Sequence, residues 1–348
     1  MTSSVLMKDM PSYALNAGQR RGGVLAAVGR TPLVRLEKIY PDLPFQLFAK
    51  LEALNPGGSI KDRPALEILE EALRTGEVGP GTLIVESSSG NMGIGLAQAC
   101  AFYGLRFRCV VDAKASRQNV RILKVYGAEI DYVAEPDPVT GEFLPARLQR
   151  VRQLLQEFPQ TFWPNQYANE NNSGAHFRTT MREVAEDLED QIDYVLCATS
   201  TCGTVRGCGE YVRSHSLPTQ VVAVDAVGSL IFSDRAAARY LPGMGAGVRP
   251  PLCDLQYIDE CVHVSDLECI TGCRRLVRLE GILAGASSGG LVAAVDRIRD
   301  KISPGATCVA ILPDRGERYL DTVYSDEWVT DHFGEGTDFW PEIETILR

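Results

Sequence analysis

The 348-residue sequence predicts an α/β fold built on mostly parallel sheets. Two observations point to this fold. Short runs rich in β-branched and apolar residues alternate with longer segments of helical periodicity, an order that is typical of parallel sheets covered by helices. Several strand-like runs, such as VLCAT at 195–199, are apolar almost throughout, as expected for strands that are buried on both faces.

The expected elements follow one another along the chain. Strands are predicted at 45–52, 82–88, 107–113, 130–134, 193–200, 221–227, 261–266 and 307–314. Helices are predicted at 65–75, 92–103, 116–126, 143–157, 174–189, 204–214, 267–280 and 289–302. Turn-rich stretches at 135–145 and 158–169 are candidate boundaries between two lobes. Ligands of such sheets bind beyond the carboxyl ends of the strands, so the loops that follow strands matter most.

The composition is that of an ordinary globular protein, with 45% hydrophobic and 23% charged residues. A net charge of −10 argues against nonspecific binding to nucleic acids or to anionic membranes. No apolar stretch reaches transmembrane length, and the first residues lack the apolar core of a signal peptide. We therefore expect a cytoplasmic protein.

Cysteine and histidine are placed in ways that do not suggest a metal site. None of the ten cysteines forms a C-x-x-C pair, and most lie in apolar runs, so we interpret them as reduced, buried side chains. The four histidines show no metal-ligand spacing with one another or with cysteine. We expect no bound metal.

Lys61 comes just after a Gly-Gly turn and just before the predicted helix 65–75. Pro64 fits a first helical turn, and Ser59-x-x-Asp62 matches a capping box. Lys61 is therefore expected at a helix N-terminus, where the helix dipole and burial lower the pKa of an amine and make it a nucleophile or a base. A solvent-exposed lysine beside a turn is the alternative.

Three loops carry groups that suit an anionic, aromatic ligand. Backbone N–H groups of ESSSGNMG (86–93) suit a carboxylate or phosphate, and Asn91 adds a donor for a phenolic oxygen. The small residues of ATSTCGTVRG (198–207) let the backbone wrap an anion. In GILAGASSGG (281–290), Ser287 is a candidate donor to a ring nitrogen.

Each of these loops, taken singly, also fits an ordinary turn or helix cap. Together with Lys61 they suit one ligand, which has an aldehyde, a phosphate, a phenol oxygen and a pyridine nitrogen. That ligand is pyridoxal 5′-phosphate (PLP). A further glycine-rich stretch, LPGMGAGVRP at 241–250, is interpreted as a plain connection rather than a lid.

The chain carries a set of motifs that occur together, in this order, in one enzyme family. They are GRTPLVRL (29–36), NPGGSIKDR (55–63), SSSGNMG (87–93), TSTCGT (199–204), EGILAGASSGG (280–290) and LPDRGERYL (312–320). Over roughly residues 20–325 the chain resembles the cysteine synthase / cystathionine β-synthase family of fold-type II PLP enzymes.

This resemblance implies a tryptophan synthase β-like fold, with two open, twisted, mostly parallel sheets in two lobes and PLP in the cleft. The smaller, mobile lobe would span 50–163, and the larger lobe would combine 1–49 with 164–348. Carboxylate binding would close the small lobe over the site, and family members usually form homodimers.

The resemblance also implies roles for matching residues. Lys61 would hold the cofactor as its internal aldimine and move the α-proton, Asn91 would contact the cofactor O3′, and Ser287 would face the pyridine nitrogen. Because a serine does not readily protonate that nitrogen, the ring is a weaker electron sink, which suits β-elimination. The substrate carboxylate would be held by Ser88, Ser89 and Gly90. The cofactor phosphate would be held by Ser200, Thr201, Cys202, Gly203 and Thr204.

The chain departs from cysteine synthases in its substrate loops. Met92 replaces the second threonine of T-S-G-N-T-G, and Ser200 replaces the first glycine of G-T-G-G-T, which adds a side chain near the substrate pocket. The glutamine that is usual upstream of QYANENN is not evident, and Tyr167 lies in that segment. Met92, Tyr167 and Ser200 are therefore candidate substrate-binding residues, and they argue against a plain sulfide acceptor.

One branch of the family is resembled more closely, that of the 2,3-diaminopropionate-pathway synthases of siderophore biosynthesis. The segments that carry this resemblance are SSSGN (87–91), FWPNQYANENN (162–172), TSTCGT (199–204) and DRGERYLDTVYSDEW (314–328). That branch joins O-phospho-L-serine to L-glutamate by β-replacement and gives N-(2-amino-2-carboxyethyl)-L-glutamate. The two carboxylates of glutamate need donors, for which Ser200, Tyr167 and an arginine such as Arg117 or Arg206 are candidates.

Three other functions remain open from the sequence. A cysteine synthase would combine O-acetylserine or O-phosphoserine with sulfide. A serine/threonine dehydratase usually reads S-x-G-N-H-A/G in the asparagine loop, so Met92 counts against it. A non-catalytic homologue would use the fold as an interaction module, and the presence of Lys61, Asn91 and Ser287 counts against that function.

Overall fold

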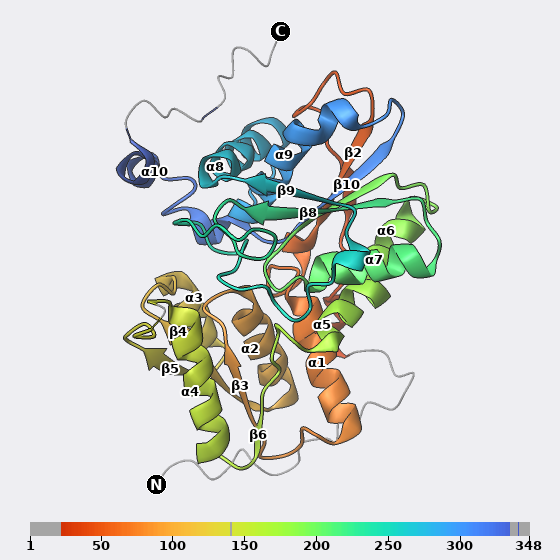
Figure 1. Cartoon of the computed structure of the whole chain (residues 1–348). Helices are drawn as coiled ribbons and strands as arrows, with labels where there is room; N and C mark the ends of the chain where they lie inside the picture. The colour runs from red at the N-terminus through yellow and green to blue at the C-terminus, as the bar shows by residue number, and fades with distance from the viewer. Residues whose placement is uncertain (1–21, 140, 335–339, 341–348) are drawn as a thin grey trace.

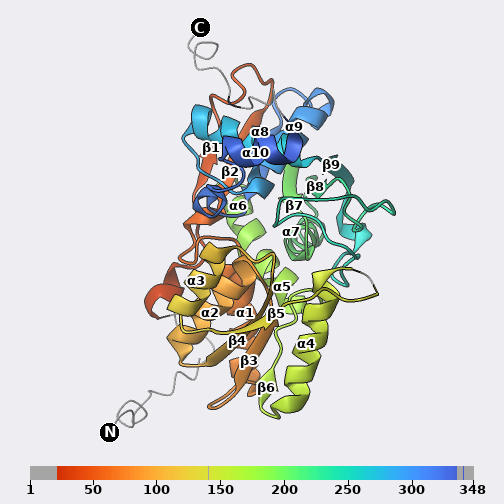
Figure 2. The same ribbon diagram turned by 90° about the vertical axis from the view of Figure 1, so that its left-hand side faces the viewer.

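The computed structural model describes residues 22–139, 141–334 and 340, and it shows two α/β lobes stacked one on the other (Figures 1 and 2). The strands are β1 (Leu33–Arg35), β2 (Gln46–Leu51), β3 (Leu83–Ser87), β4 (Arg106–Asp112), β5 (Glu129–Val133), β6 (Thr161–Phe162), β7 (Tyr194–Ala198), β8 (Gln220–Ala226), β9 (Glu260–Val264) and β10 (Thr307–Leu312). The α-helices are α1 (Asp62–Thr75), α2 (Asn91–Tyr103), α3 (Arg117–Val125), α4 (Phe143–Glu157), α5 (Glu170–Ala175), α6 (Arg182–Asp187), α7 (Gly203–Ser214), α8 (Asp266–Arg275), α9 (Ala286–Ile298) and α10 (Asp326–Phe333).

The larger lobe is built on a six-stranded sheet in the order β1-β2-β10-β7-β8-β9. Its neighbouring strands are parallel except for β1, which runs antiparallel to β2. Alternate residues face opposite layers: Val222 and Val224 of β8 pack in the core formed with α8 and α9, whereas Val221 and Ala223 pack in the core formed with α7. Both faces are buried, which explains the nearly continuous apolar runs in the sequence.

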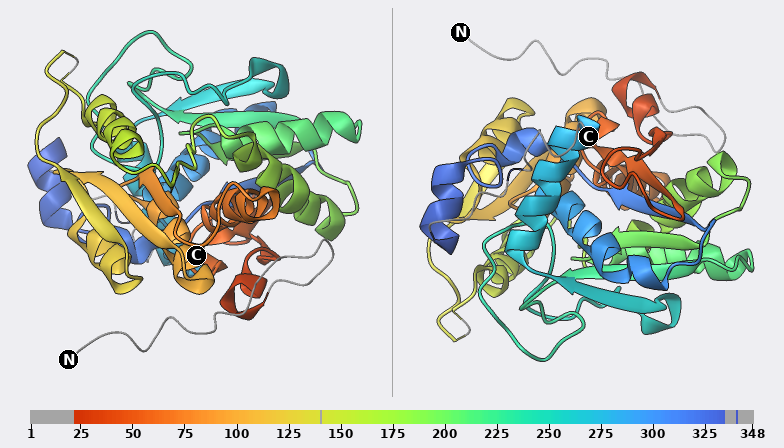
Figure 3. Two further views of the ribbon diagram at one scale, coloured as in Figure 1. Left: turned by 90° about the horizontal axis from the view of Figure 1, so that it is seen from below. Right: turned by 90° about the horizontal axis from the view of Figure 1, so that it is seen from above.

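The smaller lobe is built on a four-stranded parallel sheet in the order β5-β4-β3-β6. Ile84 of β3 packs in the core formed with α1 and α2, whereas its neighbours Leu83 and Val85 pack against Val151 and Leu154 of α4. The view from below in Figure 3 shows this sheet between α4 and the helices of its other face. The small lobe therefore has its own helix layer on each face.

The structure confirms every predicted strand, with ends that differ by at most two residues. It adds β1, β6 and α10, because the two strands are too short to show a period and α10 lies in a stretch of mixed, mostly polar sequence. The predicted helix 174–189 is divided, since a π-helical stretch, His176–Met181, separates α5 from α6. A second π-helical stretch, Leu276–Glu280, follows α8.

The predicted capping box at the start of α1 is wrong. Lys61 itself is the N-cap, and no side chain caps the helix. Ser59 Oγ instead accepts a hydrogen bond from the Lys61 N–H at 3.2 Å, and Asp62 Oδ2 accepts one from the Gly57 N–H at 2.5 Å. The two side chains tighten the turn before the helix, which fixes the backbone on both sides of Lys61.

Within the described ranges, no helix combines the length and the apolar character needed to cross a membrane. In the same residues, no three His, Cys, Asp or Glu side chains are grouped so that they would hold a metal ion. All ten cysteines are free thiols, of which only Cys253 and Cys261 are more than marginally exposed.

Candidate active site

The loops singled out in the sequence meet in the region between the two sheets. Residues 88–90 follow β3, residues 200–204 follow β7, and Asp314 follows β10, so all three loops extend from the carboxyl ends of parallel strands. Lys61 begins α1 in the same region, and Ser287 lies in the first turn of α9. The contacts described below connect these loops to one another.

Lys61 is a half-buried residue whose amine has no hydrogen-bond or ion-pair partner among the described residues. Burial lowers the pKa of Lys61 to about 8, and the nearby groups of Cys202 and Asp314 act in the opposite direction. The amine therefore lies between the loop after β7 and the loop after β10. A substantial share of this lysine is neutral near pH 7 to 8, as a nucleophile or base requires.

Asp314 joins Asn91 to the loop after β10. The Asn91 amide donates to Asp314 Oδ2 at 2.7 Å, and the Tyr319 hydroxyl donates to the same oxygen at 2.7 Å. The Arg318 guanidinium donates to Asn91 Oδ1 from the other side. Asp314 Oδ1 is buried and has no hydrogen-bond partner, and burial raises the pKa of this carboxyl.

The same aspartate lies against the segment that leads to Ser287. The Gly285 N–H donates to the Asp314 backbone oxygen at 3.1 Å, and a Cβ added to Gly285 would lie only 2.0 Å from Asp314 Oδ1. Only glycine permits this approach. Ser287 is 3% exposed, and its hydroxyl has no hydrogen-bond partner in the described part of the chain.

The loop after β7 is shaped by close backbone packing. Cys202 adopts a left-handed conformation, with φ of 64°, and forms the N-cap of α7. Thr201 Oγ1 accepts hydrogen bonds from the Gly203 N–H at 3.3 Å and from the Asn172 amide at 3.2 Å. A Cβ on Gly203 would lie 2.1 Å from Asn172 Oδ1, so this position also requires glycine.

Thr204 and His176 form an uncharged hydrogen-bonded pair beneath this loop. The Thr204 hydroxyl lies 3.3 Å from His176 Nε2, and both side chains are buried. Burial holds the pKa of His176 well below its usual value, and the charges of Lys61 and Arg63 lower it further. The imidazole is therefore neutral at physiological pH.

The loop after β3 opens α2 with free backbone N–H groups. Ser88 Oγ accepts from the Gly93 N–H at 3.0 Å and more weakly from the Gly90 N–H at 3.4 Å. Ser89 and Gly90 are half-buried. The Met92 side chain is 2% exposed and packs in the core of the small lobe, so any substrate contact from Met92 would have to come from its backbone.

Arg147 of α4 is a residue that sequence reasoning missed. Its Nη1 donates to Ser89 Oγ at 3.4 Å, and its Nε lies 3.0 Å from Asp112 Oδ2. Burial raises the pKa of Tyr167, and the charge of Arg147 acts in the opposite direction. No local motif marks Arg147, because α4 comes from a segment far in sequence from every quoted loop.

Gln166 was also missed, although it is the first residue of the quoted QYANENN segment. Its amide donates to the Ser87 backbone oxygen at 3.2 Å, and its N–H donates to Glu86 Oε2 at 3.1 Å. Glu86 is buried, which raises the pKa of its carboxyl to about 7. These contacts fasten the Tyr167 segment to the base of the loop after β3.

The two arginines suggested by the sequence lie elsewhere. Arg117 is exposed at the start of α3. The Arg206 guanidinium is paired with Glu170 at 2.6 Å and with Glu210 at 2.7 Å. The Arg206 guanidinium is therefore already occupied by two carboxylates.

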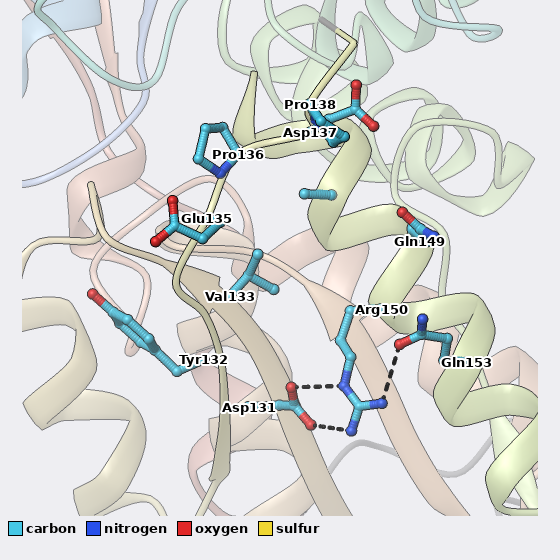
Figure 4. Close-up of a pocket in the computed structure, with 11 residues that line it drawn as sticks. Asp131, Tyr132, Val133, Glu135, Pro136, Asp137, Pro138, Gln149, Arg150 and Gln153 are labelled. Atoms are coloured by element: carbon cyan, nitrogen blue, oxygen red, sulfur yellow. Dashed lines mark hydrogen bonds and ion pairs between the residues drawn. The ribbon is translucent and has the colours of Figure 1, made fainter. Parts of the chain in front are cut away.

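A separate surface pocket of about 340 Å³ lies between β5 and α4 (Figure 4). Arg150 in this pocket forms an ion pair with Asp131 at 3.0 Å, and Figure 4 shows both side chains directed toward each other across its floor. The pocket contains none of the residues suggested by the sequence. The candidate active site is therefore the region around Lys61 and not this pocket.

Comparisons with known proteins agree with this geometry. The model of the pyridoxal-phosphate-dependent enzyme family matches residues 24–314. The chain is 47% identical over 306 residues to N-(2-amino-2-carboxyethyl)-L-glutamate synthase of Ralstonia nicotianae, a match that covers 88% of this chain and 90% of that protein.

Two solved structures are similar in fold along most of the chain. A hydrogen sulfide-producing enzyme from Fusobacterium nucleatum gives a TM-score of 0.81 at 31% identity, over 87% of this chain and 99% of that one. An O-acetylserine-dependent cystathionine β-synthase from Helicobacter pylori gives 0.80 at 28% identity, over 87% and 98% of the two chains.

The residues around Lys61 fit the cofactor of this family. The Lys61 amine and the Ser287 hydroxyl are unpartnered in the described residues, and glycine at position 203 lets Asn172 pack tightly against the loop at the start of α7. A helix N-terminus of this kind binds phosphate. On these grounds, and because the family model covers most of its length, the chain belongs to the pyridoxal-phosphate-dependent enzymes and uses PLP as its cofactor.

Proposed function

We propose that this enzyme joins O-phospho-L-serine and L-glutamate by β-replacement to give N-(2-amino-2-carboxyethyl)-L-glutamate and phosphate. The observation that carries the proposal is the 47% identity, along 88% of the chain, to a synthase of that product. The geometry supports anionic substrates, because Arg147 donates to Ser89 Oγ in the loop after β3 and its charge acts on Tyr167.

The cofactor supplies an electron sink for negative charge at the substrate Cα. In this proposal Lys61 holds PLP, Asn91 and Ser287 bind its ring, and its phosphate lies in the loop Ser200–Thr204. The amide of Asn91 is already oriented by Asp314, and the hydroxyl of Ser287 is free among the described residues. The His176–Thr204 pair keeps the floor of the phosphate loop uncharged.

Lys61 also moves the proton. It removes the proton from Cα of O-phosphoserine and returns it to the same carbon of the product, which a pKa of about 8 allows near neutral pH. Ser88, Ser89 and Gly90 hold the substrate α-carboxylate, since they lie at the N-terminus of α2, where backbone N–H groups suit an anion. Binding of the carboxylate in this loop aligns the substrate Cα with Lys61.

The phosphate leaves from Cβ, and the glutamate amine adds at the same carbon. Arg147 and Tyr167 receive the anionic leaving group, because Arg147 donates to Ser89 of the donor loop and its charge acts on Tyr167. Ser200, which is half-buried at the end of β7, lines the acceptor side. Residues of this chain are therefore assigned to proton transfer, to the leaving group and to the acceptor.

The test is product analysis with matched substrates. Purified enzyme is given O-phosphoserine or O-acetylserine, and then glutamate or sulfide, while phosphate release is followed and the product is identified by mass. Phosphate release from O-phosphoserine with consumption of glutamate is the expected result. Consumption of sulfide alone would show that the enzyme makes cysteine instead.

The proposal includes three wider points, which rest on the resemblance to this enzyme branch. The lobe at 50–163 closes over the site when the carboxylate binds, and its separate core supports independent movement. The protein works as a homodimer in the cytoplasm, and its product feeds 2,3-diaminopropionate and siderophore synthesis. Light scattering tests the dimer, and X-ray scattering with and without substrate tests closure.

A further inference from the structure

We propose that Arg239 binds the side-chain carboxylate of the acceptor amino acid and thereby selects glutamate. The inference rests on the proposed function and adds to it a residue that lies outside every motif quoted above. Arg239 belongs to the long segment between β8 and β9. Three features of its surroundings support the assignment: its position, its rigid support and its lack of an ion pair.

The Arg239 guanidinium lies beside the loop that follows β7. Its Nη1 donates to the Met244 backbone oxygen at 3.2 Å, and a Cβ added to Gly245 would lie 2.4 Å from this nitrogen. The Gly245 N–H in turn donates to the Thr199 backbone oxygen at 2.7 Å, one residue before Ser200. The cation is therefore fixed at the edge of the proposed acceptor site.

The backbone that carries Arg239 is held in place. Leu241 and Met244 are buried in the core of the large lobe. The Tyr240 N–H donates to Asp266 Oδ2 at 2.7 Å. The arginine thus extends from packed chain, which restricts the positions its guanidinium reaches and lowers the entropy that binding a carboxylate would remove.

Arg239 has no carboxylate within ion-pair distance in the part of the chain that the structure describes. Asp266 lies within electrostatic reach of it, but its Oδ2 accepts from the Tyr240 N–H instead. Arg147, by contrast, is already paired with Asp112. A half-buried arginine without an ion pair among the described residues suits a ligand that brings its own carboxylate.

Arg147 and Arg239 both act electrostatically on Tyr167, and they come from different lobes. A glutamate acceptor brings two carboxylates and must direct its amine at the reacting carbon. We assign the distal carboxylate to Arg239, because Arg147 contacts Ser89 of the loop assigned to the donor. Holding the distal carboxylate at Arg239 restricts the orientation of the amine.

The test separates the two halves of the reaction in the holoenzyme. Arg239→Met is expected to release phosphate from O-phosphoserine within about twofold of the wild-type rate in a single turnover, because no donor contact is lost. Its kcat/KM for glutamate is expected to fall by roughly 10- to 100-fold, the range for losing a hydrogen-bonded charged partner. Use of glutamine, which lacks the distal charge, is expected to stay constant, and Arg239→Lys is expected to recover part of the preference for glutamate.

Arg235 provides the matched control, since it is an exposed arginine of the same segment. Arg235→Met is expected to change neither half-reaction. An unchanged ratio of glutamate to glutamine use in Arg239→Met would overturn the inference, as would an equal loss of phosphate release. A wild-type enzyme that releases phosphate but never consumes glutamate would instead overturn the proposed function, and the inference with it.

Discussion

Two clusters of polar side chains flank Lys61, and they differ in how completely their atoms are paired. The first lies just behind the lysine and is centred on Arg63, which is 3% exposed. Its guanidinium pairs with Glu52 at 2.7 Å and with Glu183 at 2.6 Å. Buried Lys50 completes the cluster, with its amine 3.0 Å from Glu183.

The second cluster lines the cleft, and several of its groups lack partners among the described residues. The Lys61 amine and the Ser287 hydroxyl have none, and Asp314 Oδ1 is buried without a hydrogen bond. Arg239 has no ion pair. Because buried polar groups are nearly always paired, unpaired groups of this kind mark a place where a ligand supplies the missing partners. We therefore propose that the paired cluster is part of the framework and that the unpaired cluster is part of the active site.

The comparison predicts that changing Lys61 affects chemistry and not folding. Lys61→Ala is expected to lower kcat by roughly a thousandfold or more, because it removes both the attachment of PLP and the base. The urea midpoint of the apoprotein is expected to stay near the wild-type value. A variant that unfolds readily would assign Lys61 to the framework.

Arg63 should show the opposite behaviour. Arg63→Met is expected to lower the free energy of unfolding by about 3–5 kcal/mol, because it leaves the buried carboxylate of Glu52 without its cation and removes one of the two cations that pair with Glu183. Arg178→Met is the control: this exposed arginine pairs with Glu67 at the surface, where such pairs contribute about 0–1 kcal/mol. Urea denaturation of both variants measures the contrast, and equal losses would contradict it.

A third variant tests the shape of the phosphate loop. Gly203→Ala places a Cβ against Asn172, and overpacking of this kind costs about 1–3 kcal/mol. We expect that cost to appear as weaker PLP binding, measured by equilibrium dialysis. Gly247→Ala meets no atom within 4 Å and should bind PLP normally. Equal affinity in both variants would remove the argument for a tight loop.

The smallest effect concerns the pH dependence of PLP uptake. The neutral amine attacks the aldehyde, so uptake by the apoprotein should rise with pH and level off above the pKa of Lys61, which burial lowers to about 8. The rate should rise about tenfold between pH 7 and pH 9 and then change little. A rate that keeps rising beyond pH 10 would show an ordinary, solvated lysine.

Much of the fold followed from local pattern. The continuous apolar strands and the helical periods between them predicted the core strands of both sheets, because burial on both faces leaves a signal in each strand. The edge strands β1 and β6 left no such signal. The π-helical stretch at His176–Met181 was not predicted either, since its hydrophobic period is close to that of an α-helix.

The sequence by itself determined the chemical groups of the site. Lys61, Asn91 and Ser287 each stand at the start of a helix, in loops whose small residues are visible in the sequence. Local backbone rules govern such helix starts, so a short window of sequence contains the information.

Only the tertiary structure decided which groups meet. Asp314 connects Asn91 with the segment of Ser287 through hydrogen bonds. Arg147 and Arg239, which belong to different lobes, both act electrostatically on Tyr167. These contacts join segments that are far apart along the chain, and their positions are set by strand order and core packing. No short window of sequence contains that information, because it depends on how the two sheets are assembled.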